Sequence, residues 1–137
     1  MRRPVISHCL ICEDIRIETR NLYSVMGVYG FAPWVVVRVM DFKLPVVFSV
    51  LFAGSDAEGK SILRIELRAP DGTIVPAQIF PTSHEFNFVP NIGVTCVFGI
   101  NTIFPVPGTY SVLLFADDNE LFRAQFKLDE AGTKDLA

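Results

Sequence analysis

Short stretches in which apolar and polar side chains alternate recur along the chain. Between residues 62 and 68, leucine and isoleucine alternate with arginine and glutamate, and the stretch from 120 to 128 repeats the pattern. Because successive side chains of a strand point to opposite faces, each stretch predicts a strand with one packed and one solvated face. No segment shows sustained helical periodicity.

Turn signals separate these stretches. The clearest are Pro-Asp-Gly at 70–72 and Asp-Asp-Asn at 117–119, which combine residues that favour tight turns. Many short strands with frequent turns are typical of sandwiches and barrels. The pattern predicts an all-β fold, a two-layer antiparallel β-sandwich of the immunoglobulin-like Greek-key type with roughly eight or nine strands. We expect one domain over residues 1–128 and a frayed C-terminal tail over 129–137.

Composition adds few constraints. The chain has 137 residues, half of them hydrophobic, including 12 phenylalanines. So many large apolar groups predict either an aromatic core or a surface buried against another chain. The net charge of -3 argues against a nucleic-acid partner. The sequence contains no apparent secretion signal and no run long enough to span a membrane, so we expect a cytoplasmic protein with reduced cysteines.

Two expected strands, residues 46–53 and 109–116, are apolar on both faces. A two-layer sandwich covers only one face of each sheet, so the other face must meet a loop, an insertion such as residues 31–42, or a second subunit. This is the best sequence indication of association, as a homo-oligomer or with a protein partner. The candidate interface residues are Phe48, Val50, Phe52, Leu113, Phe115 and Trp34.

Two acidic pairs are candidates for a ligand or cation site. Glu13 and Asp14 directly follow an apolar strand, and Asp117 and Asp118 lie at a hairpin tip. Each pair has a structural alternative, in which the carboxylates bind backbone N–H groups or neighbouring arginines. No run matches a calcium-binding loop, so we predict no metal or other cofactor.

The Cys-x-x-C at Cys9 and Cys12 lies in an expected strand. Residues three apart in a strand point to opposite faces, so the pair predicts buried structural thiols and not a redox or zinc site. Basic side chains on expected outer faces would form a docking surface for an acidic partner if all those strands shared one sheet. The alternative is a solvated face with cross-strand ion pairs.

Four stretches, residues 11–18, 24–29, 67–72 and 108–112, carry a resemblance. With the Cys-Glu-Asp that ends at Asp14 and the Gly-Val-Tyr that ends at Tyr29, the chain resembles a family of small uncharacterised bacterial proteins. The resemblance implies an immunoglobulin-like sandwich and transfers no catalytic residues. It singles out Glu13 and Asp14 without assigning them a role.

No nucleophile stands beside a convincing base, and no glycine-rich loop precedes a helix. We therefore expect a non-enzymatic β-sandwich that self-associates or serves as a protein-interaction module. The alternative is a domain that binds a small ligand or cation on its acidic loops. An enzyme of unrecognised type is the third hypothesis.

Overall fold

A computed structural model describes residues 3–18, 22–32, 35–39, 42, 44–55 and 57–130. These residues form ten strands and no helix, so none of them could cross a membrane as an apolar helix. The strands are β1 (Val5–Ile17), β2 (Tyr23–Phe31), β3 (Val36–Val39), β4 (Val46–Ser55), β5 (Gly59–Arg68), β6 (Ala77–Phe80), β7 (His84–Phe88), β8 (Val94–Thr102), β9 (Gly108–Ala116) and β10 (Asn119–Glu130). The all-β prediction is confirmed, and the expected number of strands is too low.

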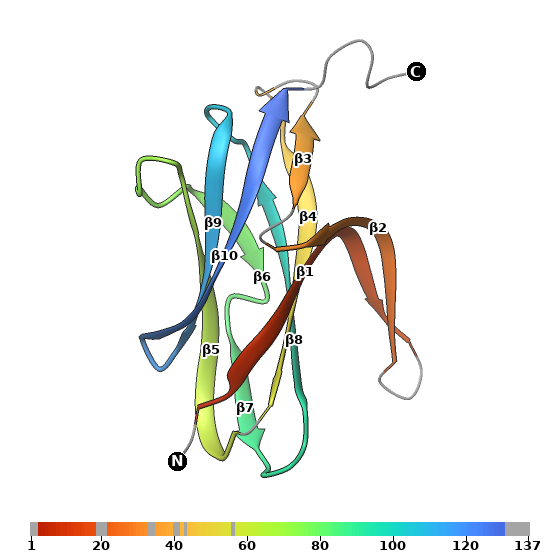
Figure 1. Cartoon of the computed structure of the whole chain (residues 1–137), viewed down its shortest axis with the longest axis vertical. Coiled ribbons are helices and arrows are strands. Elements are labelled where there is room, and N and C mark those ends of the chain that lie inside the picture. Colours follow the sequence, from red (N-terminus) through yellow and green to blue (C-terminus); the bar gives the residue numbers. More distant parts are fainter. Residues whose placement is uncertain are drawn as a thin grey trace.

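The strands form two five-stranded sheets that pack against each other (Figure 1). The first sheet has the order β2-β1-β4-β8-β6, and the second has the order β3-β10-β9-β5-β7. All pairs are antiparallel except β3 with β10, which run parallel with Val36 beside Lys127. The expectation of a purely antiparallel fold is wrong at this pair, because the chain leaves the first sheet after β2 and joins the edge of the second before returning as β4.

Aromatic rings fill the space between the sheets. Phe48 packs against Phe104 and Phe126, with ring centroids 5.9 and 5.8 Å away. The ring of Tyr110 meets Phe104 edge-on at 4.8 Å, and its buried hydroxyl donates a hydrogen bond to the carbonyl of Val106 at 2.6 Å. Much of the phenylalanine content therefore serves the core. Such ring pairs each contribute about 0.5–1.5 kcal/mol beyond the burial of apolar area.

Two strand boundaries differ from the sequence expectation. β1 continues through Glu13 and Asp14, where a break was expected, because its distal half pairs with β2. β10 continues through Asp129 and Glu130, which pair with β3, so the strand runs two residues beyond the expected end of the domain. The rest of the expected tail, residues 131–137, lies outside the described residues.

Candidate functional site

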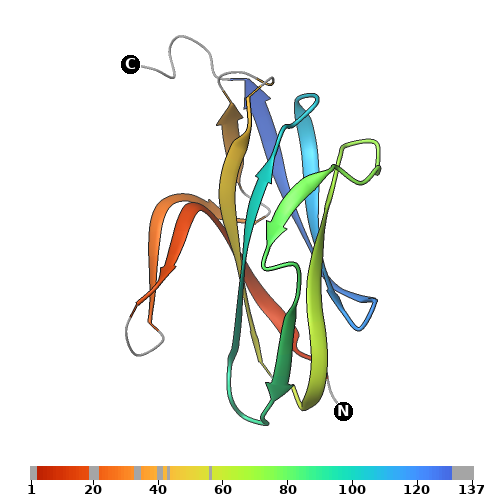
Figure 2. The ribbon, with the colours of Figure 1, turned by 180° about the vertical axis from the view of Figure 1, so that it is seen from behind.

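The β1–β2 hairpin leaves the first sheet part-way along its length. β1 pairs with β4 from Val5 to Cys12, and beyond Cys12 it pairs only with β2. We call this distal part, residues 13–17 and 23–28, the arm. Figures 1 and 2 show the arm bending away and standing to one side of the two sheets. Among the described residues, one edge of β2 therefore has no neighbouring strand.

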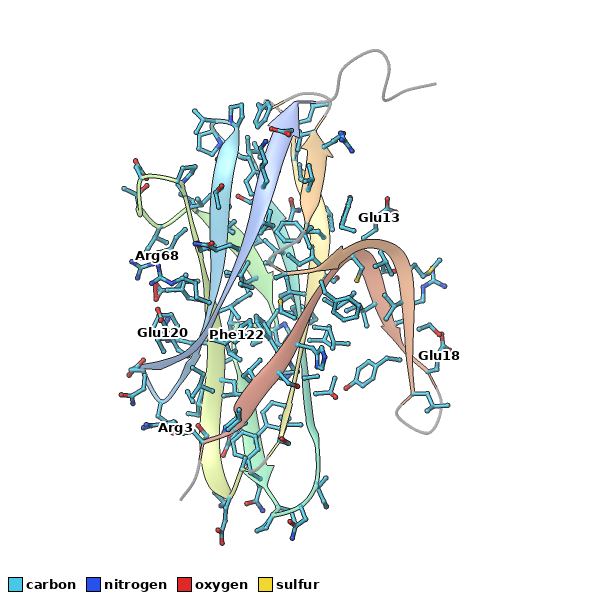
Figure 3. All side chains as sticks on the ribbon, viewed as in Figure 1. Arg3, Glu13, Glu18, Arg68, Glu120 and Phe122 are labelled. Carbon is cyan, nitrogen blue, oxygen red and sulfur yellow. The ribbon has the colours of Figure 1, made fainter. Side chains whose placement is uncertain are left out.

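A β-bulge accompanies the bend. Ile11 lies opposite Gly30 and Cys12 lies opposite Val28, so Tyr29 is an additional residue on β2. Bulges bend a strand and increase its twist. Figure 3 shows Glu13 at the top of the bend.

Gly27 and Glu13 fit together at this bend. Gly27 has a φ of +64°, a conformation that costs other L-residues about 1–2 kcal/mol. A Cβ at Gly27 would also lie 2.7 Å from Cγ and Cδ of Glu13. The Glu and Gly of the signature are therefore in contact. Burial raises the pKa of the nearby Tyr29, and the Glu13 carboxylate raises it further.

Asp14 has an ion-pair partner on its own strand. Its carboxylate lies 3.5 Å from Arg16, and both side chains are largely exposed, so the pair contributes little to stability. Across the described part of the chain, no group of three or more His, Cys, Asp or Glu residues is placed to hold a metal ion.

Asp117 and Asp118 form the two-residue turn between β9 and β10. Their φ values are +48° and +68°, as a type I′ hairpin turn requires. The Asp117 carboxylate accepts hydrogen bonds from the Ile62 N–H at 3.0 Å and the Ser61 hydroxyl at 2.8 Å, which hold its pKa below the usual value. Asp118 pairs with Arg64 at 3.2 Å. This turn and the arm lie on opposite sides of the molecule (Figure 1), so the two acidic pairs do not converge.

The cysteines are buried and unbonded to each other. Cys9 belongs to the core cluster, whereas Cys12 is opposite Ser49 on the other face of β1. Burial raises the pKa of Cys9 to about 12 and that of Cys12 to about 11. Thiols in this state are poor nucleophiles and metal ligands.

Most of the candidate interface side chains are buried within the chain. Phe48, Val50 and Phe52 point into the core and are at most 1% exposed. Trp34 lies outside the described residues. A contact surface on β4 would instead use the opposite face of the strand, where Val47 is 62% exposed.

On β9, the chain covers its own outer face. Leu113 is 1% exposed and lies between its cross-strand neighbours Glu66 and Arg123. Phe115 is half-buried beneath the Arg64 guanidinium, whose central carbon is 4.4 Å from the ring centroid. The cover of this apolar face is thus a set of long charged side chains.

The condition for a single basic docking face, that all the strands concerned share one sheet, is not met. Glu66 pairs with both Arg64 and Arg68 at 3.0 Å. Arg16 belongs to β1 in the first sheet and Glu18 directly follows that strand, so they do not extend this face. Figure 3 shows Arg68 and Glu120 on the side of the molecule opposite the arm.

The four sheet edges differ sharply. β3 and β6 have four residues each and β7 has five; β3 carries Arg38, β7 carries Glu85, and Pro76 and Pro81 flank β6. Short strands, charges and prolines all discourage a further strand from pairing. β2 has nine residues with neither a charge nor a proline. Its exposed large side chains are Tyr23, Met26, Val28 and Phe31.

Sequence reasoning did not show that β2 is an edge. Edge position depends on which strands become neighbours, and the pattern of a single strand does not report this.

A pocket of about 460 Å³ lies between the arm, strands β4 and β8 of the first sheet, and the segment that connects β6 to β7 and continues into β7. His84 lies in its wall, with Nε2 2.7 Å from the carbonyl of Val97 and its ring edge-on to Phe98. The lining residues are Asp14, Ile15, Tyr23, Ser49, Phe80, Pro81, His84, Phe86, Thr95, Val97 and Gly99. A mainly apolar pocket of this size with a few polar groups has the properties of a small-molecule site.

The chain matches no known family model and no curated protein sequence. The resemblance to a bacterial family therefore stays a prediction, and the functional conclusions depend on the geometry of the arm and the pocket.

Proposed function

We propose that this protein is a non-enzymatic interaction module whose arm accepts a further β-strand at the free edge of β2. The strand comes from a second copy of the chain or from another protein. The single observation that carries the proposal is the nine-residue edge with no charge and no proline. An unpaired edge presents a row of backbone N–H and C=O groups, which an added strand would satisfy.

The finer fold assignment belongs to this proposal. We propose an immunoglobulin-like Greek-key sandwich in a family of small bacterial proteins that act in the cytoplasm. The hydrogen bond from the Tyr110 hydroxyl to Val106 supports this topology, since it resembles the tyrosine corner of such sandwiches. The free, buried cysteines are compatible with a reducing compartment.

The absence of a catalytic role is also part of the proposal. Ser7 lies 2.9 Å from Nδ1 of His8, but the two residues are adjacent and exposed, and the Ser7 hydroxyl donates to the carbonyl of Ala53 at 3.2 Å. A serine whose proton is directed to a carbonyl is not activated by the neighbouring imidazole.

Site-specific photocrosslinking in cells tests the proposal. We would place benzoylphenylalanine at position 28 on the free edge, where Val28 is 57% exposed, and at position 74, where Ile74 is 61% exposed. Position 28 is expected to give a discrete adduct that position 74 does not. Equal labelling from both positions, or none from position 28, would refute an interaction at the arm.

The pocket beside the arm favours a second candidate function, binding of a small, largely apolar molecule. Asp14, one of the predicted ligand residues, lines this pocket, whereas Asp117 and Asp118 do not. A thermal-shift screen of metabolites tests it, with Thr95→Phe as a variant that narrows the pocket. A stabilising compound whose effect Thr95→Phe abolishes would support the site, and a flat screen would count against it.

A further inference from the structure

We infer that the strand accepted by β2 belongs to a second copy of this chain, paired antiparallel about a two-fold axis. The pairing would join two five-stranded first sheets into one continuous ten-stranded sheet. This inference depends on the proposed function, because it names the partner of the same edge. Closed two-fold dimers are the commonest symmetric assemblies of soluble proteins.

Charge favours self-pairing at this edge over the edges at β3 and β7, and the uncharged edge at β6 is only four residues long. Since β2 carries no charged residue, no register of two antiparallel copies places like charges directly opposite each other within the strand. Self-pairing through β7 would bring two copies of Glu85 close together, and self-pairing through β3 would do the same with Arg38. The edge that is long enough to pair is thus also electrostatically neutral toward itself.

Symmetry limits the registers. A two-fold axis perpendicular to the sheet keeps each face continuous, so a residue must lie opposite one whose side chain shares its face. Before the bulge, Ser24, Met26 and Val28 share one face and alternate with Tyr23, Val25 and Gly27. The axis must therefore pass through a residue pair, and the central candidates are Val25, Met26 and Gly27.

Glu13 decides among these three registers. Its side chain lies against Gly27, so an axis at Gly27 would bring two Glu13 carboxylates toward each other. An axis at Met26 places Met26 opposite its own copy and Val25 opposite Gly27 of the second copy. The β1 neighbours of Val25 and Met26 are Ile15 and Asp14, and Asp14 is paired with Arg16 at 3.5 Å, so neither axis brings two unpaired carboxylates together. We therefore assign the axis to Val25 or Met26.

The size of the edge sets the strength of the dimer. With the axis at Val25 or Met26, the paired part of β2 is residues 23–27 or 23–29. These segments extend over about 17–23 Å, and a sheet is about 10 Å thick, so edge pairing covers roughly 170–230 Å² on each partner. Stable interfaces bury about 800 Å² per partner. We therefore expect a weak dimer that dissociates on dilution.

Sedimentation velocity over a dilution series from about 1 mM to about 1 µM tests the inference. The wild type is expected to shift from dimer to monomer. Met26→Lys places like charges beside the axis and should weaken dimerisation about tenfold or more. Ile74→Lys is the matched control, because Ile74 is 61% exposed and Met26 is 45% exposed. A wild type that is monomeric throughout, or a Met26→Lys variant that dimerises normally, would overturn the inference.

Engineered cysteines locate the axis. Residues directly opposite in an antiparallel pair have Cα atoms about 4.5–5.5 Å apart, within the range that a disulfide spans. Under mild oxidation with copper phenanthroline, Met26→Cys or Val25→Cys should give a covalent dimer and Ile74→Cys should not. The native cysteines are buried and do not compete. Equal crosslinking of all three variants would contradict the assigned axis.

The photocrosslinking experiment separates the two proposals. An adduct from position 28 of twice the chain mass agrees with self-pairing. An adduct of any other mass, together with a monomeric wild type, would overturn the second-copy inference while leaving the edge as an interaction site. No adduct would overturn both.

Discussion

The outer face of β9 and the free edge of β2 are both rich in apolar side chains, yet the chain closes the first and leaves the second open. Leu113 is 1% exposed because charged side chains of β5 and β10 lie on both sides of it. On β2, Val28 and Phe31 remain 57% and 55% exposed. No charged residue within β2 is available to cover them.

The difference shows what an apolar strand surface means in a small sandwich. Arginine and glutamate have long apolar stems that cover neighbouring groups while their charged ends stay in water. Where strands on both sides supply such residues, an apolar outer face needs no partner. At a sheet edge that supplies none, the same composition favours association.

The largest expected effect is on the free energy of unfolding, and it should differ between a buried and an exposed phenylalanine. Phe48 is 1% exposed and packs against two other rings, so Phe48→Ala should lower the free energy of unfolding by about 3–5 kcal/mol. Phe80 is 83% exposed, and Phe80→Ala should change it by no more than about 0.5 kcal/mol. Guanidinium denaturation measures both. Similar costs at the two positions would mean that the core is wrongly placed.

The second prediction concerns the local stability of the arm at its bend. Gly27→Ala places a side chain at a φ of +64° and against Glu13, so the arm should lose about 1–2 kcal/mol of local stability. Backbone amides of β2 should then exchange with deuterium about tenfold faster, and those of β9 should be unchanged. In the double variant with Glu13→Ala the close contact disappears and the φ strain remains, so only part of the loss should be recovered. Uniformly faster exchange over both strands would contradict an independent arm.

The strands themselves were predictable because alternation reports local burial. The pattern at residues 62–68 became β5, the pattern at 120–128 became β10, and the turn residues Asp117 and Asp118 adopt the expected hairpin. Alternation shows which face of a strand is packed and not which neighbour covers the other face. Leu113 and Phe115 were therefore candidates for an interface. In the structure they are covered by Arg64 and Glu66 of β5, which is far away in the sequence but pairs with β9.

The candidate site was less predictable for the same physical reason. Glu13 and Gly27 both stood out in the sequence, but their contact depends on the register of the hairpin and on the bulge at Tyr29. The open edge depends on strand order, which results from the packing of the whole chain. The pattern within a single strand shows neither the register of the hairpin nor the order of the strands.

The third prediction removes the charged cover from the outer face of β9. Arg64→Ala removes the guanidinium over Phe115 and the ion pairs with Glu66 and Asp118, which should cost about 1 kcal/mol. The uncovered apolar face should also bind the dye ANS more strongly than the wild type does. Arg123→Ala is the companion variant on the other side of Leu113. Unchanged dye binding in both variants would show that these side chains do not provide the cover.

The smallest expected effect is a pH dependence of stability that arises from Glu66, beside the covered outer face of β9. Burial raises the pKa of Glu66, but the hydrogen bonds from Arg64 and Arg68 outweigh it, so the pKa lies below its ordinary value of 4.5. A carboxyl whose pKa is lowered by folding stabilises the folded state above the unfolded value and loses that contribution as pH falls through the folded one. Near neutral pH, the free energy of unfolding of the wild type should exceed that of Glu66→Gln by about 0.5–1 kcal/mol. This difference should shrink below about pH 4.5. Urea denaturation of both proteins from pH 7 to pH 3 measures it. If the difference were the same at every pH, the charge of the Glu66 carboxylate would not be what stabilises the fold.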